Sequence, residues 1–126
     1  MVIAQKAIIK KGDKYLVLLR SLRKEFSPLL WDFPGGKLEP GETLEQGVIR
    51  ELKEETNLDI KPVKIISQCE YGDDAKKYHF NFYSVEVLFG ELKLSHEHID
   101  FKWASKEEIL ALPHVPHIDQ FFKDNT

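Results

Sequence analysis

The stretch GGKLEPGE, residues 35–42, decides how the rest of the chain is organised. It follows WDFP (31–34) and leads into a run, 44–56, whose apolar residues repeat with the period of a helix. Thr43 and Gln46 have the spacing of a capping box at the start of that helix. Asn57 stands where a left-handed residue usually ends a helix. The stretch therefore predicts a glycine loop joined to a capped helix.

The predicted helix carries three acidic residues on one face. Glu51, Glu54 and Glu55 are spaced i, i+3 and i+4. Glu51 and Glu55 fall along or beside the apolar stripe, and Glu54 lies at its flank; the stripe is formed by Leu44, Val48 and Leu52. Carboxylates in this position suit Mg²⁺ or Mn²⁺, which prefer oxygen ligands. Solvated acidic faces and ion-pair networks produce similar patterns, so all three interpretations stay open.

The stretch resembles the signature box of the Nudix hydrolases. That pattern is Gly, five spacers, Glu, seven spacers, then Arg-Glu-apolar-x-Glu-Glu-x-Gly-apolar. The matching positions here are Gly36, Glu42, Arg50, Glu51, Leu52, Glu54, Glu55 and Leu58. Asn57 replaces the last glycine, and asparagine tolerates the left-handed conformation, so we expect little damage to the fold.

The resemblance implies one domain, residues 1–126, with an α+β fold: a Nudix-type α/β/α sandwich around a mixed β-sheet. It implies hydrolysis of a nucleoside diphosphate linked to another moiety. Glu51, Glu54 and Glu55 would hold Mg²⁺ (or Mn²⁺), helped by a carbonyl of the glycine loop at Gly36. Arg50 would orient the carboxylates by ion pairing; the simpler interpretation is a single i,i+4 pair with Glu54.

The general base stays undecided between Glu54, Glu51 and Glu97. Glu97 lies in a loop before Trp103, and a glutamate at a similar place reaches the metal site in MutT-type members of the family. A solvated loop carboxylate is the alternative. Glu42 would close the loop at the helix start or bind the metal through water.

Substrate contacts are expected from a basic segment and from aromatic residues. Arg20 and Arg23 directly precede the acidic box, where they would contact phosphate or base; surface solubility is the alternative. Phe33 and Phe80 are the aromatic candidates, although such rings more often lie in the core. His114 and His117 are candidates for a position near the cleft, although histidines of this kind are more common in surface turns.

A (deoxy)nucleoside triphosphate, cleaved to a monophosphate and pyrophosphate, is the favoured substrate. NDP-sugars and dinucleoside polyphosphates are alternatives. A third possibility is a non-catalytic nucleotide-sensing module on the same fold. The complete carboxylate set argues against this module, because such modules often lose it.

Composition narrows the class of protein. The chain has 126 residues, a net charge of -3 and a pI of about 6.0, so no basic footprint indicates a nucleic-acid polymer as partner. The single cysteine, Cys69, fits a reducing compartment and a buried structural thiol. We find no signal peptide and no apolar run of membrane-spanning length. These features predict a soluble cytoplasmic protein whose oligomeric state is open.

Periodicity and turn residues predict the remaining elements. Strands are expected at 2–10, 15–20, 63–71, 77–88 and 101–103. The alternation in 77–88 places His79, Asn81 and Tyr83 on one face and Phe80 and Phe82 on the other. A second capping box at 105–108 opens a helix that extends to 111. Pro113 and Pro116 are expected to end that helix, and a terminal helix is expected at 118–123.

Overall fold

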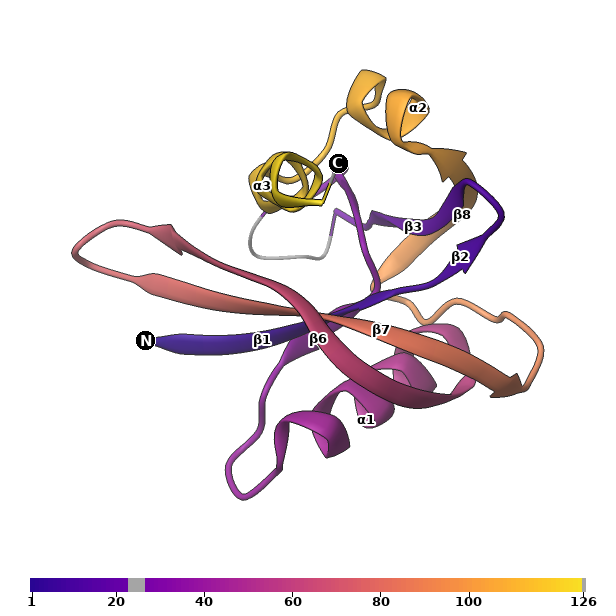
Figure 1. Ribbon diagram of the computed structural model, residues 1–126, viewed down its shortest axis with the longest axis horizontal. Coiled ribbons are helices and arrows are strands. Elements are labelled where there is room, and N and C mark those ends of the chain that lie inside the picture. The colour runs from indigo at the N-terminus through magenta and orange to yellow at the C-terminus, as the bar shows by residue number, and fades with distance from the viewer. Residues whose placement is uncertain (23–26, 126) are drawn as a thin grey trace.

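The computed structural model describes residues 1–22 and 27–125. Its first sheet has the strand order β5-β1-β7-β6 (Figure 1). These strands are β1 (Val2–Ile8), β5 (Gly35–Lys37), β6 (Asp59–Gly72) and β7 (Lys77–Phe89). β1 pairs in parallel with β7, whereas β1 with β5 and β6 with β7 are antiparallel. The sheet is therefore mixed, as the resemblance implied.

A second sheet is built around β3 (Lys14–Arg20). β3 pairs with β2 (Lys10–Lys11), with β4 (Trp31–Asp32) and, along its other edge, with β8 (His98–Ser105). The middle of β3 is buried on both faces, as its continuous apolar run predicts. The described strands are thus divided between two sheets, with β4 leading directly into the glycine loop.

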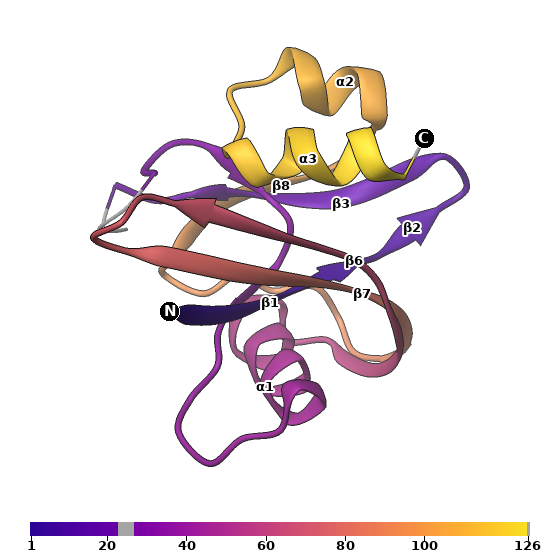
Figure 2. The same ribbon diagram turned by 60° about the vertical axis from the view of Figure 1, so that its left-hand side comes forward.

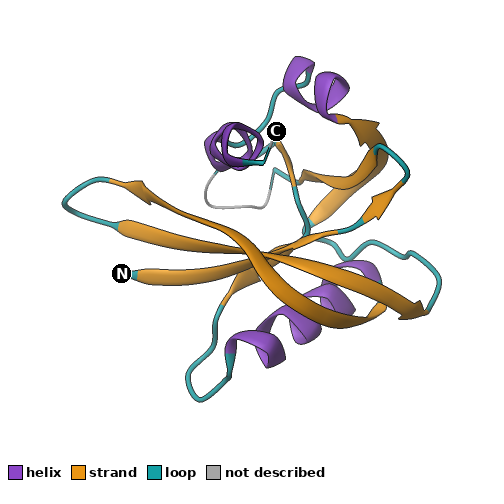
Figure 3. Ribbon diagram, viewed as in Figure 1, coloured by secondary structure: helices purple, strands orange, loops and turns teal. Residues whose placement is uncertain are grey.

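Helices cover the strands from both sides (Figures 2 and 3). α1 (Leu44–Thr56) packs on one face of the first sheet, and one apolar cluster joins it to β3 and β6. α2 (Lys106–Ala111) and α3 (Pro116–Asp124) lie on the opposite side. This arrangement confirms the α+β sandwich.

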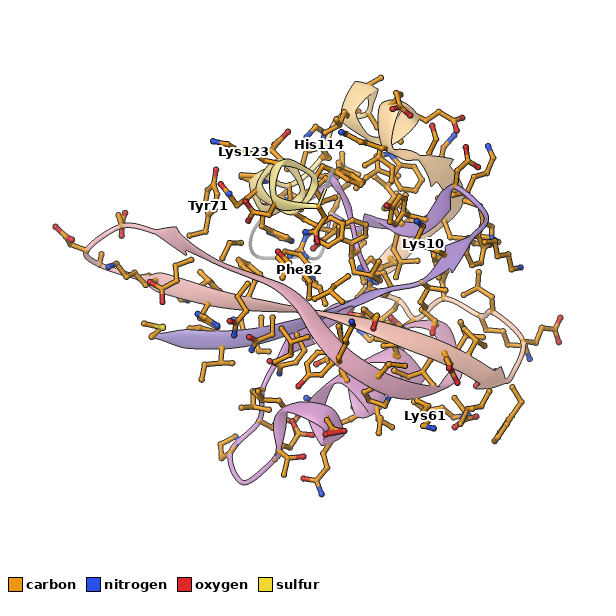
Figure 4. All side chains as sticks on the ribbon, in the orientation of Figure 1. Lys10, Lys61, Tyr71, Phe82, His114 and Lys123 are labelled. Carbon is orange, nitrogen blue, oxygen red and sulfur yellow. The ribbon has the colours of Figure 1, made fainter. Side chains whose placement is uncertain are left out.

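The larger core cluster is aromatic and lies between β7 and α3. Phe82 is fully buried there (Figure 4), and the ring centroids of Phe33 and Phe121 are 5.3 Å apart at an interplanar angle of 75°. Edge-to-face pairs of this kind contribute about 0.5–1.5 kcal/mol beyond their buried area. α3 is therefore held on the sheet mainly by aromatic packing.

Local sequence signals located α1 correctly. The helix occupies 44–56, with Thr43 and Gln46 forming both hydrogen bonds of the capping box. β6 is longer than expected and includes Pro62. Because β6 is an edge strand, a missing N–H is tolerated there, and the register shifts between Pro62 and Lys64.

Pro116 was wrongly expected to interrupt the chain before the terminal helix. It is instead the first residue of α3. Proline suits that position, because its fixed φ is helical and the N–H it lacks has no partner within the helix.

No helix in the described ranges is long and apolar enough to cross a membrane.

Asn57 caps α1 in the left-handed conformation, with φ 63°. Its side-chain Nδ2 donates to the Glu91 carbonyl at 3.1 Å. Asn57→Gly removes that bond and the left-handed strain together, so the free energy of unfolding should change by less than about 0.5 kcal/mol. Asn57→Ala loses the bond and keeps the strain, and should destabilise by about 1–2 kcal/mol. Urea unfolding of both variants checks this, and a loss above about 1 kcal/mol for Asn57→Gly would contradict the cap assignment.

Candidate active site

Two glycines bring the loop into direct contact with β1 and α1. Gly35 has φ 138° and pairs with Lys6, and a Cβ there would collide with the Gln5 carbonyl. A Cβ on Gly36 would lie 2.6 Å from the carboxylate carbon of Glu51. The loop therefore needs glycine at 35 for its backbone and at 36 for the space that Glu51 fills.

The three acidic residues of α1 share a helix face but have different surroundings. Glu55 is only 3% exposed, and its Oε1 accepts a hydrogen bond from the Gly35 N–H at 2.8 Å. The Glu51 side chain is 16% exposed and lies 2.9 Å from Arg50. Glu54 is 57% exposed and lies 3.2 Å from the same guanidinium. The acidic face is thus buried at Glu55 and open to solvent at Glu54.

Arg50 connects the loop after the glycines to α1. Its Nε and Nη2 donate to the two oxygens of Glu42 at 2.6 and 2.9 Å, and Nη2 also donates to the Lys37 carbonyl. Its Nη1 lies within 4 Å of three more carboxylates, those of Glu39, Glu51 and Glu54. The hydrogen bond to Glu42 contributes most to raising the pKa of Arg50, and the same contact lowers the pKa of Glu42. Arg50 is therefore the centre of a network, beyond a single i,i+4 pair, and Glu42 closes the loop through it.

A cavity of about 530 Å³ lies beside this network. Glu51 and Glu55 line it from α1, and Gly36 lines it from β5. The other predicted site residues that line it are Arg20, Phe80 and Glu97. Tyr71 and Tyr78 line it from the β6–β7 hairpin, and Figure 4 shows the Tyr71 side chain on the side of the hairpin that faces α3. Pockets of this size accommodate nucleotide-sized ligands.

The remaining predicted residues lie elsewhere. Phe33 is 1% exposed and packs in the aromatic core, so its ring is placed to support α3 rather than to meet a ligand. Glu54 lies at the solvent side of the Arg50 network. Arg23 lies outside the described residues.

The oxygen atoms at this wall are of the type that divalent cations prefer as ligands. Carboxylate and carbonyl oxygens are hard ligands, and Glu51, Glu55 and Gly36 share one cavity wall. Burial raises the pKa of Glu51, against the opposing pull of Arg50, so a nearby cation would relieve the cost of its charge. Within the described ranges, no group of three or more acidic, histidine or cysteine side chains converges as a ready-made metal cage. Arg50 and the Gly35 N–H occupy the carboxylate oxygens instead.

A second charge cluster centres on Asp32, which the sequence analysis did not single out. Its Oδ2 accepts from Lys6 Nζ at 2.8 Å and from Arg20 Nη1 at 3.2 Å, and its Oδ1 accepts from His117 Nε2 at 2.8 Å. Burial favours the neutral acid, but Lys6, His117 and Arg20 hold the pKa of Asp32 well below its ordinary value. Lys6 also reaches the carbonyls of Phe33 and Gly35, at 3.4 and 3.3 Å. The cluster therefore ties β1 and β3 to the glycine loop and α3.

Of the two positions open for His117, a surface turn and the cleft, the structure shows the cleft. The residue is buried, lines the cavity, and stacks on Phe80 with ring centroids 4.0 Å apart. Two signals in the sequence pointed to this. His117 belongs to the apolar stripe of α3, together with Ile118, Phe121 and Phe122. Lys6 likewise occupies an inward position between Ala4 and Ile8, where a charged residue needs a partner.

Comparison with known proteins relates the whole chain to one family. The family model described as NUDIX domain matches residues 3–124. The CTP pyrophosphohydrolase of Escherichia coli K12 is 32% identical over 110 residues, 87% of this chain and 80% of that protein. The 8-oxo-dGTP diphosphatase of Proteus vulgaris is 31% identical over 90 residues, 71% and 80% of the two chains.

A solved structure has the same fold. The crystal structure of the MutT protein from Methanosarcina mazei Go1 superimposes with a TM-score of 0.85 at 32% identity, covering 99% of this chain and 95% of that one. The family model and these relatives together span nearly the whole chain, and Gly36, Glu51 and Glu55 of the box line its cavity. The chain belongs to the Nudix hydrolase family.

Proposed function

We propose that the chain hydrolyses (deoxy)nucleoside triphosphates to a monophosphate and pyrophosphate, with Mg²⁺ or Mn²⁺ as cofactor. The observation that carries the proposal is the composition of one cavity. Its lining combines acidic residues and a glycine loop, Glu51, Glu55 and Gly36, with aromatic rings, Tyr78 and Phe80. A nucleotide has the same division into a polyanion and a flat ring.

The activities for which two relatives are named favour the same substrate class. The Escherichia coli relative is named for CTP and the Proteus vulgaris relative for 8-oxo-dGTP. Both substrates are nucleoside triphosphates, which differ in base. We therefore propose for this chain the cleavage of a nucleoside triphosphate. Its base preference would depend on the residues that line its own cavity.

Charge explains the need for a cation. Glu51 and Glu55 line the cavity, and a triphosphate entering it is also an anion, so the two repel. Mg²⁺ held at this wall would supply positive charge that offsets the repulsion, and it would make a water molecule more acidic. Glu51, Glu54, Glu55 and the Gly36 carbonyl are the proposed holders.

The chain's own groups would position the reacting atoms and move the proton. Phosphoryl transfer depends mainly on positioning and on stabilisation of charge. The Gly35 N–H holds Glu55, and Arg50 holds Glu51 and Glu54. Among the candidates for general base, Glu51 and Glu97 line the cavity, whereas Glu54 lies at its solvent side. Attack of water would break the bond between the α- and β-phosphates and release a proton to that base.

One prediction of the proposed function concerns the metal. Chelation with EDTA should abolish pyrophosphate release, and Mg²⁺ should restore it, because the acidic wall otherwise repels the substrate. Turnover is measured by pyrophosphate release over a panel of nucleoside triphosphates, NDP-sugars and dinucleoside polyphosphates. Full activity in metal-free buffer would refute the cofactor assignment. Turnover of NDP-sugars alone would refute the substrate class.

The second prediction separates catalysis from structure. Glu54→Gln and Glu55→Gln keep size and a hydrogen-bond acceptor but remove a charge, so each should lose about 100-fold or more in turnover. The melting temperature without metal should stay the same or rise, since the repulsion between like charges on one helix face is reduced. The Mg²⁺-dependent rise in melting temperature should shrink, because it depends on cation affinity.

Glu45→Gln is the matched control, since Glu45 is an exposed residue in the first turn of the same helix. It should leave both turnover and the metal-dependent shift unchanged. If Glu54→Gln and Glu55→Gln also turn over like the wild type, the catalytic assignment fails, and a non-catalytic nucleotide-sensing module becomes the better description.

The third prediction uses the space at Gly36. Gly36→Ala places a methyl group 2.6 Å from the Glu51 carboxylate, so this side chain must move. The expected result is loss of about 10-fold or more in turnover, since small displacements of positioning groups are costly. Circular dichroism and the metal-free melting temperature should stay close to wild type if only the side chain moves. Wild-type turnover in a folded Gly36→Ala protein would show that the position of Glu51 is not critical.

A further inference from the structure

One part of the cavity wall, which we call the ring end, is a short stack of rings. Tyr78 and Phe80 lie 5.9 Å apart between centroids at 12°, and Phe80 and His117 lie 4.0 Å apart at 22°. All three line the cavity. Phe80 covers one face of the imidazole, so His117 meets a ligand through its remaining face and edge.

Asp32 fixes which nitrogen of His117 carries the proton. Its Oδ2 is occupied by two cationic donors, Lys6 and Arg20, and its Oδ1 lies 2.8 Å from His117 Nε2. An ionised carboxylate only accepts hydrogen bonds, so Nε2 must be the donor. The three partners of Asp32 thus assign the imidazole hydrogen to Nε2.

The second ring nitrogen then depends on the charge of the imidazole. Burial lowers the pKa of His117, Asp32 opposes this, and the nearby positive charges of Lys6 and Arg20 lower it further. The ring is therefore neutral at pH 7, and Nδ1 carries a lone pair. No side chain or backbone group within the described ranges donates to Nδ1, and the ring lines the cavity, so this acceptor is available to a ligand.

We propose that Asp32 and His117 set the hydrogen-bonding polarity of the ring end of the cavity, which selects bases that offer an N–H donor. His117 is the specificity-determining residue, because its Nδ1 would accept from the base. Asp32 is a positioning residue that acts through it. This inference rests on the proposed function, since it specifies how the same cavity reads its substrate. The cost of leaving a buried acceptor unpaired is the physical basis of the selection.

The first test needs no substrate. ¹⁵N NMR of histidine-labelled protein distinguishes the two neutral tautomers and the charged ring. Wild-type His117 should be neutral with its proton on Nε2 at pH 7. In Asp32→Asn, Lys6 and Arg20 should hold the amide oxygen and turn the amide N–H₂ toward Nε2, moving the ring proton to Nδ1. A charged ring or an Nδ1–H tautomer in the wild type would overturn the proposal.

The second test compares matched substrates that differ only in the amino group. The pairs are ATP with purine riboside triphosphate, and CTP with 2-pyrimidinone riboside triphosphate; the second member of each lacks a donor on the base edge. The wild type should prefer the amino member of at least one pair by about 10-fold or more in kcat/KM. His117→Phe should bring that ratio close to one. Asp32→Asn should lower or reverse it.

Equal kcat/KM within both pairs for the wild type, or an unchanged preference in His117→Phe, would overturn the proposal. Asp13→Asn and His96→Phe are the matched controls, since both residues are exposed, and they should keep the wild-type ratio. Melting temperatures identify a variant that fails to fold. If Asp32→Asn fails to fold, the tautomer of His117 in the wild type and the kcat/KM ratio in His117→Phe decide whether the proposal stands.

Failure of the proposed function looks different. If no nucleotide is hydrolysed, that function is wrong, while the tautomer and the relative binding of the same pairs still test this inference. Equal binding within both pairs would then reject it, and tighter binding of the amino member would support it.

Discussion

The glycine loop can lie against α1 only because residues 35 and 36 have no side chains. A Cβ at Gly35 would collide with β1, and one at Gly36 would occupy the place of the Glu51 carboxylate. The same close approach lets the Gly35 N–H reach the buried Glu55 at 2.8 Å. Because β5 pairs with β1 at one edge of the first sheet, this contact fixes α1 relative to the sheet. The position of every acidic residue on α1 follows from it.

Two charge clusters of opposite sign then flank one cavity. Around Arg50, four carboxylates share a single guanidinium, so negative charge is in excess. Around Asp32, one carboxylate meets two permanent cations, so positive charge is in excess. Buried ion pairs of this kind contribute little net stability, because desolvation offsets the attraction. Their arrangement matters more for what the cavity attracts: a cation at the α1 side, and an anion near Lys6 and Arg20.

The sequence predicted what is decided locally. The bounds of α1, its cap and the division of β7 into two faces depend on neighbouring residues, and these were correct. Pro62 and Pro116 show the limit, since the effect of a proline depends on whether the strand is an edge and on which helix position it occupies. The Asp32 cluster was missed because its partners are distant in sequence. Lys6 is 26 residues away and His117 is 85.

The helix face shared by the three acidic residues was also a local prediction, but their different environments were not. Glu55 is held by a buried N–H, whereas the pair between Glu54 and Arg50 is exposed and contributes at most about 1 kcal/mol. Arg50 contacts Glu42 through Nε and Nη2 and contacts Glu54 through Nη1, so the two contacts use different donors. Releasing Glu54 therefore costs little and leaves the loop in place. The face thus combines a carboxylate fixed by the loop, Glu55, with one that can change partners at little cost, Glu54.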